Sequence, residues 1–308
     1  MARVSRSALA LAALASVAVP GLDPVAVGPA AVADPDFDMA VVTDGDGRRW
    51  VVRAPRRPAA AAVVEAEARL LPALRPLLPA PVPVPLGHRR LPEGGRCMVS
   101  EYLPGRPLDV GGLTAGSPLA AELGRLLAAL HEVPPDVFEE AGVPVYEADE
   151  YRQRPLSDVD RAAATGHVPA ALLSRWEREL ERVAHWRFVP TPVHGDLAGE
   201  HVLVHDGRLS GVLGWGEARV ADPADDLAWV VAGAPADAVD TVLEAYAMAR
   251  GHEPDPHLVD RARLAGELAL ARWLLSGVAA DDAGVVERAM RALAQLAELV
   301  PDDDPARG

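Results

Sequence analysis

The spacing of apolar residues changes about a third of the way along this chain, and this change limits the possible fold more than any other feature. Before residue 104, short extended runs are separated by turn residues, including Asp-Gly-Asp-Gly at 44–47, a strong hairpin signal. After residue 107, apolar residues recur with helical spacing. Strands followed by helices predict an α+β chain, with an antiparallel sheet lobe before a larger, mainly helical lobe.

The individual elements are predicted from the same patterns. Strands are expected at 25–32, 37–43, 50–54, 84–90 and 96–102, and helices at 58–78, 118–131, 169–186, 236–250, 256–277 and 283–299. Residues 133–155, rich in acidic, proline and aromatic residues, predict an irregular loop or a substrate-facing insertion. We therefore expect a first lobe at 1–103, a second lobe at 104–300 and a disordered acidic tail at 301–308.

The amino terminus has two interpretations. Arg3 and Arg6 precede a small apolar run at 8–19, which is the outline of a secretory signal peptide but too short to span a membrane. Alternatively, Ser5 or Ser7 caps a short helix of the folded domain. We favour the folded helix and a cytoplasmic location, because the motifs further along the chain indicate chemistry that uses a cytosolic nucleotide.

Composition excludes several kinds of chemistry. All 30 basic residues are arginine, and the chain contains no lysine and no asparagine. Schiff-base lysines, phosphate-binding lysines and metal-binding asparagines are therefore excluded. A net charge of −15 argues against nucleic-acid binding and favours a small cationic or neutral partner. Cys97 is the only cysteine, which excludes an internal disulfide and multi-cysteine metal sites. We expect a monomer that does not bind membranes.

One compact segment carries most of the chemical information. Residues 194–197 read His-Gly-Asp-Leu, His201 follows five residues after Asp196, and an apolar strand at 209–213 leads into Gly-Trp-Gly-Glu at 214–217. In protein-kinase-like enzymes a base aspartate, a metal-binding asparagine and a metal-binding aspartate recur at these intervals. A His-Gly-Asp triplet alone is a weak signal, but the spacing of the whole segment is specific.

With the downstream Asp-Pro at 222–223 and Asp-Leu-Ala at 226–228, this segment resembles the aminoglycoside phosphotransferase family of antibiotic kinases. It is most similar to the macrolide 2'-phosphotransferase branch, in which a histidine replaces the metal-loop asparagine, as His201 does here. The resemblance implies a protein-kinase-like fold and phosphorylation of an antibiotic hydroxyl from GTP or ATP with Mg²⁺. It favours GTP and a macrolide.

The resemblance also implies roles for individual residues. Asp196 would be the catalytic base, and His201 would approach the metal or position the loop. In the first lobe Arg53 would replace the phosphate-binding lysine and pair with Glu67. Backbone groups at the junction of the lobes would contact the purine, namely Glu101, Tyr102 and Leu103.

The chain departs from the family pattern at one critical position. Where the family carries a metal-binding aspartate, this chain has Gly214, which supplies no ligand. Glu217 is the candidate replacement that we name for the metal, and Asp222 or Glu200 are further candidates, although structural roles suit each of them. The function is therefore either an antibiotic kinase with an altered metal site or an inactive pseudokinase that retains nucleotide or drug binding. A secreted binding protein is a third, weaker alternative.

The acceptor stays open between two antibiotic classes. Aminoglycosides are polycations, which suits the acidic composition and candidate contacts at Glu147, Asp149 and Glu150. Macrolides are large and mostly apolar, which suits the late helices, where apolar residues are candidate pocket or core positions: Leu268, Leu270, Trp273 and Leu274. The histidine at 201 makes a macrolide our preferred acceptor.

Overall fold

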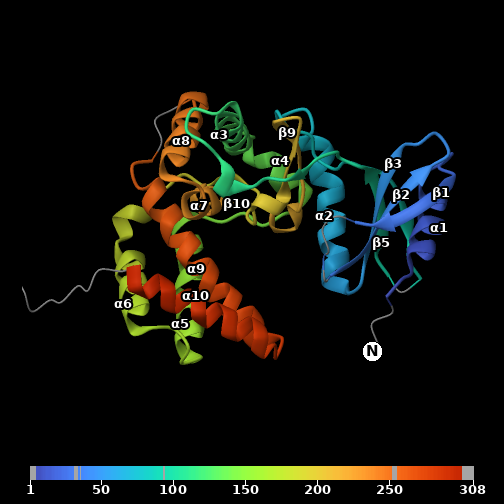
Figure 1. The fold of residues 1–308 in the computed structure, drawn as a ribbon. Coiled ribbons are helices and arrows are strands. Elements are labelled where there is room, and N and C mark those ends of the chain that lie inside the picture. The colour runs from blue at the N-terminus through green and yellow to red at the C-terminus, as the bar shows by residue number, and fades with distance from the viewer. Residues whose placement is uncertain (1–4, 31–33, 35, 93, 252–254, 300–308) are drawn as a thin grey trace, which may run out of the picture.

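The computed structural model describes residues 5–30, 34, 36–92, 94–251 and 255–299, which form two lobes (Figure 1). The first lobe contains one five-stranded antiparallel sheet with strand order β1-β2-β3-β5-β4. Its strands are β1 (Pro24–Pro29), β2 (Phe37–Asp44), β3 (Arg49–Pro55), β4 (Pro85–Arg90) and β5 (Arg96–Glu101). The predicted acidic tail at 301–308 lies outside the described residues.

The predicted hairpin joins β2 to β3, and its turn is closed by one aspartate. Asp44 Oδ1 accepts hydrogen bonds from the backbone N–H groups of Asp46 and Arg48. Its Oδ2 accepts from Trp50 Nε1 at 3.0 Å. Aspartate side chains commonly bond the backbone of the residues that follow, which stabilises such turns.

Helices cover both faces of this sheet. Figure 1 shows α1 (Ala8–Ala18) on one face, with α2 (Pro58–Leu74) between the opposite face and the second lobe. Ser7 caps α1 by accepting a hydrogen bond from the N–H of Ala10, and Leu11 and Ala15 are buried against the strands. The structure therefore contains the short helix capped by Ser7 that the sequence favours. Among the described residues, every helix is too short or too polar to cross a membrane.

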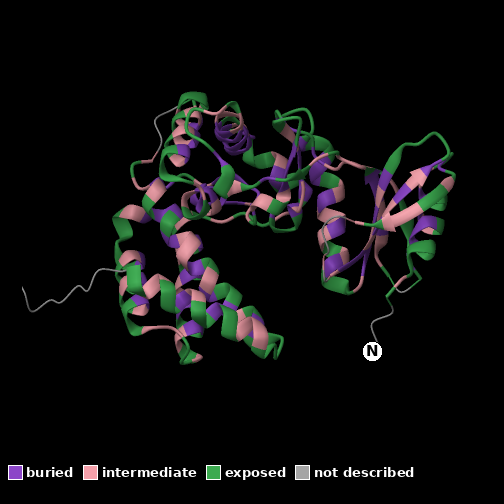
Figure 2. Ribbon diagram, viewed as in Figure 1, coloured by how far each residue is buried: buried purple, intermediate pink, exposed green. Residues whose placement is uncertain are grey.

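The second lobe is mainly helical. Its α-helices are α3 (Pro118–His131), α4 (Pro135–Ala141), α5 (Ala148–Ala164), α6 (Ala170–Glu181), α7 (Ala224–Gly233), α8 (Ala236–Ala249), α9 (Leu258–Ala279) and α10 (Ala283–Leu299). Figure 2 shows the buried positions concentrated on the facing sides of these helices, with α3 among the most completely buried. Two cores result, one around α3 and α8 and another between α5, α6, α9 and α10.

The prediction of an irregular loop at 133–155 is wrong. Most of this stretch lies in α4 and the first half of α5. Pro135 occupies the first turn of α4, where a missing N–H costs nothing, and Gly142 ends the helix at φ +76°. In α5 the buried residues repeat with helical spacing, beginning with Tyr151, Pro155 and Val159. Burial of this face holds the helix together despite the interior proline.

Two small sheets bring the motif segments together. A two-stranded sheet pairs β7 (Thr191–Val193) with β10 (Arg219–Ala221). A three-stranded sheet contains β6 (Arg106–Pro107), β8 (Val202–His205) and β9 (Arg208–Val212), in the order β6-β8-β9. The connection from β7 to β8, residues 194–201, and the connection from β9 to β10, residues 213–218, therefore lie side by side at the lobe junction.

Candidate active site

The loop at 194–201, hereafter the 194–201 loop, is anchored by a buried carboxylate from α7. Asp226 is fully buried, and its two oxygens accept hydrogen bonds from the backbone N–H groups of His194 (2.8 Å) and Gly195 (2.9 Å). His131 Nε2 lies 3.4 Å from the same carboxylate, and Tyr246 contacts the other ring nitrogen of His131. Burial alone would raise the pKa of Asp226, but the hydrogen bonds from His131 and the loop hold it below its usual value. The loop is thus tied to the core of the second lobe.

His194 connects the loop to the neighbouring 213–218 connection. Its Nε2 donates to the carbonyl of Leu213 at 2.7 Å, while its Nδ1 accepts from the N–H of Asp196 at 3.4 Å. The ring also packs against Trp215, with centroids 4.8 Å apart. Burial lowers the pKa of His194 to about 4, so the ring is neutral at pH 7 and can accept at Nδ1. We therefore interpret His194 as a loop-positioning residue.

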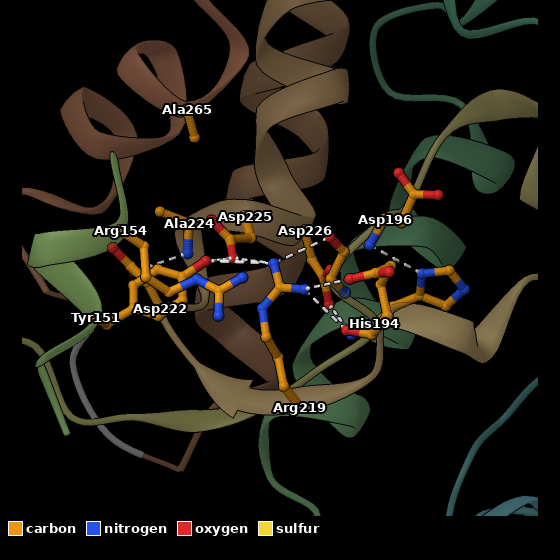
Figure 3. A network of polar contacts seen from close by, with 12 residues as sticks. Tyr151, Arg154, His194, Asp196, Arg219, Asp222, Ala224, Asp225, Asp226 and Ala265 are labelled. Atoms are coloured by element: carbon orange, nitrogen blue, oxygen red, sulfur yellow. Dashed lines mark hydrogen bonds and ion pairs between the residues drawn. The ribbon is translucent and has the colours of Figure 1, made fainter. Parts of the chain in front are cut away.

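Arg219 closes the loop from the other side. Figure 3 shows its guanidinium between the carboxylate of Asp225 and the backbone of the loop. Nη2 donates to Asp225 at 2.8 Å and to the Gly195 carbonyl at 3.1 Å, and Tyr151 also contacts Asp225. Gly195 has φ +82°, and a Cβ there would lie 2.3 Å from the Glu217 carbonyl oxygen, so this tight approach requires glycine.

The Asp196 side chain is exposed and lines a cavity within the second lobe. Partial desolvation raises the pKa of its carboxyl above the usual value, although nearby His201 acts in the opposite direction. Asp226 and Arg219 fix the backbone of the loop just before Asp196, and the carboxylate extends from this fixed backbone to the cavity wall. This arrangement suits a group that accepts a proton from a bound hydroxyl.

This second-lobe cavity has a volume of about 660 Å³, within the range of small-molecule sites. Its lining includes five carboxylates and four guanidinium groups. Two of the carboxylates are neutralised by direct ion pairs, because Asp225 binds Arg219 and Asp222 binds Arg261. Apolar residues from several helices and from the loop complete the wall, namely Pro155, Trp186, Leu197, Ala228, Trp229, Ala232, Ala265, Leu268 and Ala269.

The pair between Asp222 and Arg261 forms part of the wall of this cavity. Arg261 donates two hydrogen bonds to the carboxylate, at 2.7 and 3.0 Å, and both side chains are buried. Arg261 also donates to Asp255 and to the His185 carbonyl, so it joins the start of α9 to the segment before β7. Burial outweighs the arginine and raises the pKa of Asp222. Both carboxylate oxygens are occupied, so the structure gives Asp222 a structural role.

A second cavity lies between the lobes. Its lining includes the residues predicted to bind the nucleotide, together with His201. These are Arg53, Glu67, Glu101, Tyr102, Leu103 and His201. Arg53 Nη1 lies 2.6 Å from Glu67 Oε2, as the resemblance implies for a nucleotide site. Glu67 is almost completely buried, and its Oε1 has no hydrogen-bond partner among the described residues. An unpartnered buried oxygen on a cavity wall is an acceptor available to a ligand or to water.

Gly214 also lines the interlobe cavity, whereas Glu217 does not. Glu217 lines the second-lobe cavity with Asp196, its side chain is 66% exposed, and its carboxylate lies 3.8 Å from Arg219. The structure therefore does not bring the two predicted metal ligands, His201 and Glu217, together in one cavity. Glu200 lines the interlobe cavity beside His201 and is exposed.

Several residues of the site were missed by the sequence analysis. Arg219 and Asp225 lie inside the recognised segment and could have been assigned by their proximity to Asp196. Tyr151 and Arg261 lie far from the segment in sequence, 74 residues from Asp225 and 39 residues from Asp222 respectively. No local spacing signals such distant pairs.

The chain has two lobes with a cavity between them, and the 194–201 loop lines both this cavity and the second-lobe cavity. This is the architecture of a kinase-like phosphotransferase. Residues 32–266 match the phosphotransferase enzyme family called APH, and the chain belongs to this family. The predicted family and the predicted two-lobed fold are confirmed.

Three relatives place the chain within this family. The apoenzyme structure of macrolide 2'-phosphotransferase MphH from Brachybacterium faecium is 32% identical, with a TM-score of 0.78 over 92% of this chain and 97% of that one. Macrolide 2'-phosphotransferase type I is 29% identical, with a TM-score of 0.76 over 94% and 98%. Viomycin phosphotransferase from Streptomyces vinaceus is 32% identical over 53% of this chain and 62% of its own length. The chain matches its curated relatives over less than two thirds of their length, 65% and 62%.

Proposed function

We propose that this protein transfers the γ-phosphate of a nucleotide to a hydroxyl group of an antibiotic, with a macrolide as the acceptor. The observation that carries the proposal is the reach of the 194–201 loop. Asp196 lines the second-lobe cavity, and His201, five residues later, lines the interlobe cavity. An acceptor in the first and a nucleotide in the second would meet at this loop.

In the proposed reaction, Asp196 and Arg53 have separate roles. The acceptor hydroxyl oxygen forms a bond to the γ-phosphorus, the bond to the bridging oxygen breaks, and the nucleoside diphosphate leaves. Asp196 accepts the hydroxyl proton, and its raised pKa makes it a stronger base than an ordinary aspartate. Arg53, oriented by Glu67, faces the cavity and would contact the phosphates.

The nucleotide would lie with its base against the segment that joins the lobes. Glu101, Tyr102 and Leu103 line the cavity, and their backbone groups are the available partners for a purine edge. We propose GTP rather than ATP, because two macrolide enzymes are 32% and 29% identical to this chain over most of its length, and the family resemblance associates that branch with GTP.

The charge of the second-lobe cavity favours a macrolide over an aminoglycoside. A polycation would need several free carboxylates, but Asp222 and Asp225 are already paired, and Arg154 and Arg272 also line the wall. The acidic residues considered as aminoglycoside contacts, Glu147, Asp149 and Glu150, are exposed and do not line this cavity. Of the four apolar α9 residues considered for a pocket, Leu268 alone lines it. A large, mostly apolar molecule with one amine suits this mixed wall.

Mass spectrometry of antibiotic panels incubated with protein and GTP or ATP tests the proposal. We expect a phosphorylated macrolide with GTP, no product from aminoglycosides, and no product from the Asp196→Asn variant. Phosphorylation of aminoglycosides alone would contradict the assigned acceptor.

Gly214 supports a second candidate, a pseudokinase that binds nucleotide or drug without catalysis. That candidate would be supported if nucleotides bound in calorimetry but no antibiotic in the panel were phosphorylated. It would be excluded by a single macrolide product that depends on Asp196.

A further inference from the structure

The interlobe cavity differs from a kinase metal site in the two positions that would hold the metal. Mg²⁺ prefers oxygen ligands in near-ideal octahedral geometry. Here the first position is the imidazole of His201, and the second is Gly214, which has no side chain. Within the described ranges, the one cluster of three possible metal-ligating side chains lies elsewhere, at His185, His257 and Asp260. The residues present do not fit Mg²⁺.

The missing ligand is also sterically excluded. Gly214 has φ +79°, and a Cβ built on it would lie 2.6 Å from Cδ2 and 2.8 Å from Nε2 of His201. Real Cβ atoms essentially never approach other heavy atoms so closely. The histidine ring therefore occupies the space in which a side chain at 214 would begin.

His201 is not free to move away. Its Nδ1 donates to the carbonyl of Asp196 at 2.6 Å, and its own carbonyl accepts from the N–H of Leu213 at 2.8 Å. Moving the ring off Gly214 would break the first bond and disturb the loop that carries Asp196. His201 and Gly214 are thus a matched pair, in which an anchored ring packs over a residue without a side chain.

Other oxygen donors do not replace the lost ligand. Glu67 gives one oxygen to Arg53 and has a second without a partner among the described residues, while Glu217 lies in the other cavity. Asp34 and Glu101 also line the interlobe cavity, but Asp34 accepts a hydrogen bond from the N–H of Asp36 and Glu101 is the last residue of β5, at the junction of the lobes. Glu200 is a single exposed carboxylate beside His201. The two positions that hold Mg²⁺ through oxygen atoms in kinases carry an imidazole nitrogen and no side chain here, so the cavity lacks both of the usual ligands.

We infer that the nucleotide binds to this protein without a metal ion ligated by the protein, so that any Mg²⁺ present is carried by the nucleotide phosphates alone. This inference rests on the proposed nucleotide site. Coupling between two ligands is reciprocal, so a protein that gives Mg²⁺ no ligand gains no nucleotide affinity from it. Mg²⁺ bound to the nucleotide also neutralises part of the phosphate charge that would attract Arg53. Adding Mg²⁺ therefore leaves the affinity of the protein for the nucleotide unchanged or weakens it.

Titration calorimetry with GTP and with ATP, each in excess Mg²⁺ and in EDTA, tests the inference on the full chain. We expect equal or weaker affinity with Mg²⁺ for the nucleotide that binds. Tightening by about fivefold or more, the range of roughly 5–150-fold that is usual for coupled ligands, would overturn it. An absence of binding in both conditions would instead overturn the proposed nucleotide site, and this inference with it.

The double variant H201N/G214D tests whether restoring the two metal-binding side chains restores the effect of Mg²⁺ on nucleotide binding. It removes the ring and supplies two oxygen-bearing side chains, so we expect Mg²⁺ to tighten nucleotide binding at least fivefold. Gly214→Asp alone should not gain this coupling, because the ring remains in place. His205→Asn makes the same chemical change at an exposed neighbouring site and should behave as the natural protein. Equal coupling in Gly214→Asp and in the double variant would show that His201 does not block the metal position.

Discussion

The Asp196 end of the 194–201 loop is held by charged groups, whereas its His201 end is held by hydrogen bonds to backbone groups, with the ring packed over a residue without a side chain. At the first end, Asp226 and Arg219 bond the loop backbone directly. At the second end, the imidazole ring packs over Gly214. If the proposed function is correct, the proton-accepting half of the site keeps its anchoring groups, while the metal-binding half has a ring and a glycine in place of two oxygen ligands.

The two halves also respond differently to change. Buried ion pairs and hydrogen bonds leave a large penalty when one partner is removed, because the other remains desolvated. A packed ring over glycine is sensitive to added atoms instead. Substitutions that delete groups should therefore damage the Asp196 end most, and substitutions that add atoms should damage the His201 end most.

The largest expected effect is that of Asp196→Asn. An amide cannot accept the hydroxyl proton, so we expect kcat for macrolide phosphorylation to fall about 10²–10⁴-fold, the usual contribution of a general base. GTP affinity and the circular dichroism spectrum should be unchanged. Asp206→Asn, in the exposed turn between β8 and β9, is the matched control and should retain full activity. Equal kcat in the two variants would show that Asp196 does not act as the base.

The next largest effect is expected from Asp226→Ala. Two buried backbone N–H groups would lose their acceptor, each at a cost of roughly 1–3 kcal/mol, so the free energy of unfolding should fall by about 3 kcal/mol or more. Urea unfolding at pH 7 measures this change. Asp240→Ala, on the exposed face of α8, should cost less than about 0.5 kcal/mol. A similar loss in both variants would contradict the anchoring role of Asp226.

Sequence patterns predicted the elements whose signals are local. The helix predicted at 118–131 matches α3 at both ends, because proline in the first turn and a buried face mark it clearly. The stretch 133–155 was mistaken for a loop, because the interior Pro155 and the acidic composition obscured the helical spacing of its few buried residues. Those residues are buried by α6 and α9, which local composition does not reveal.

The same limit applies to the site, where local spacing could be predicted from the sequence and long-range contacts could not. The intervals between Asp196, His201 and Gly214 are local, and the sequence pattern named all three positions, whose roles in the reaction stay predictions. The pair of Arg261 with Asp222 joins elements far apart in the chain, and only the packing of α9 brings them together. Whether Gly214 left an open or a filled space also could not be predicted, since it depends on how the ring of His201 is anchored.

The filled space can be tested by comparing two glycines with similar backbones. Gly214 and Gly207 have φ +79° and +74°, but a Cβ on Gly207 would meet nothing within 4 Å. Alanine at either position pays for the left-handed backbone, and alanine at 214 also collides with His201, adding about 1–3 kcal/mol. Urea unfolding should therefore show a larger loss for Gly214→Ala than for Gly207→Ala.

A double-mutant cycle then assigns that difference to the ring. With His201→Ala as background, the extra cost of Gly214→Ala over Gly207→Ala should largely disappear. If the extra cost persists without the ring, another contact limits position 214, and the matched-pair interpretation fails.

The smallest expected effect concerns pH and tests the Asp196 end. The pKa of His194 is lowered to about 4 by burial, while in the unfolded chain it is about 6.5. Between these values the unfolded chain binds a proton that the folded protein excludes, so the stability from neutral His194 is complete above pH 6.5 and is lost as the pH falls towards 4. Lowering the pH by one unit below 6.5 should reduce the free energy of unfolding by about 1 kcal/mol.

Urea unfolding of the natural protein and of His194→Gln between pH 7.5 and 5 measures this effect. The free energy of unfolding should decline less steeply for the variant, whose amide does not titrate. Asp226 does not affect this comparison. Its pKa is lowered from the usual aspartate value, so the stability that its carboxylate provides is lost only at pH values below the range of this titration. Parallel declines in the two proteins would mean that His194 is protonated in the folded state and does not accept a hydrogen bond from Asp196.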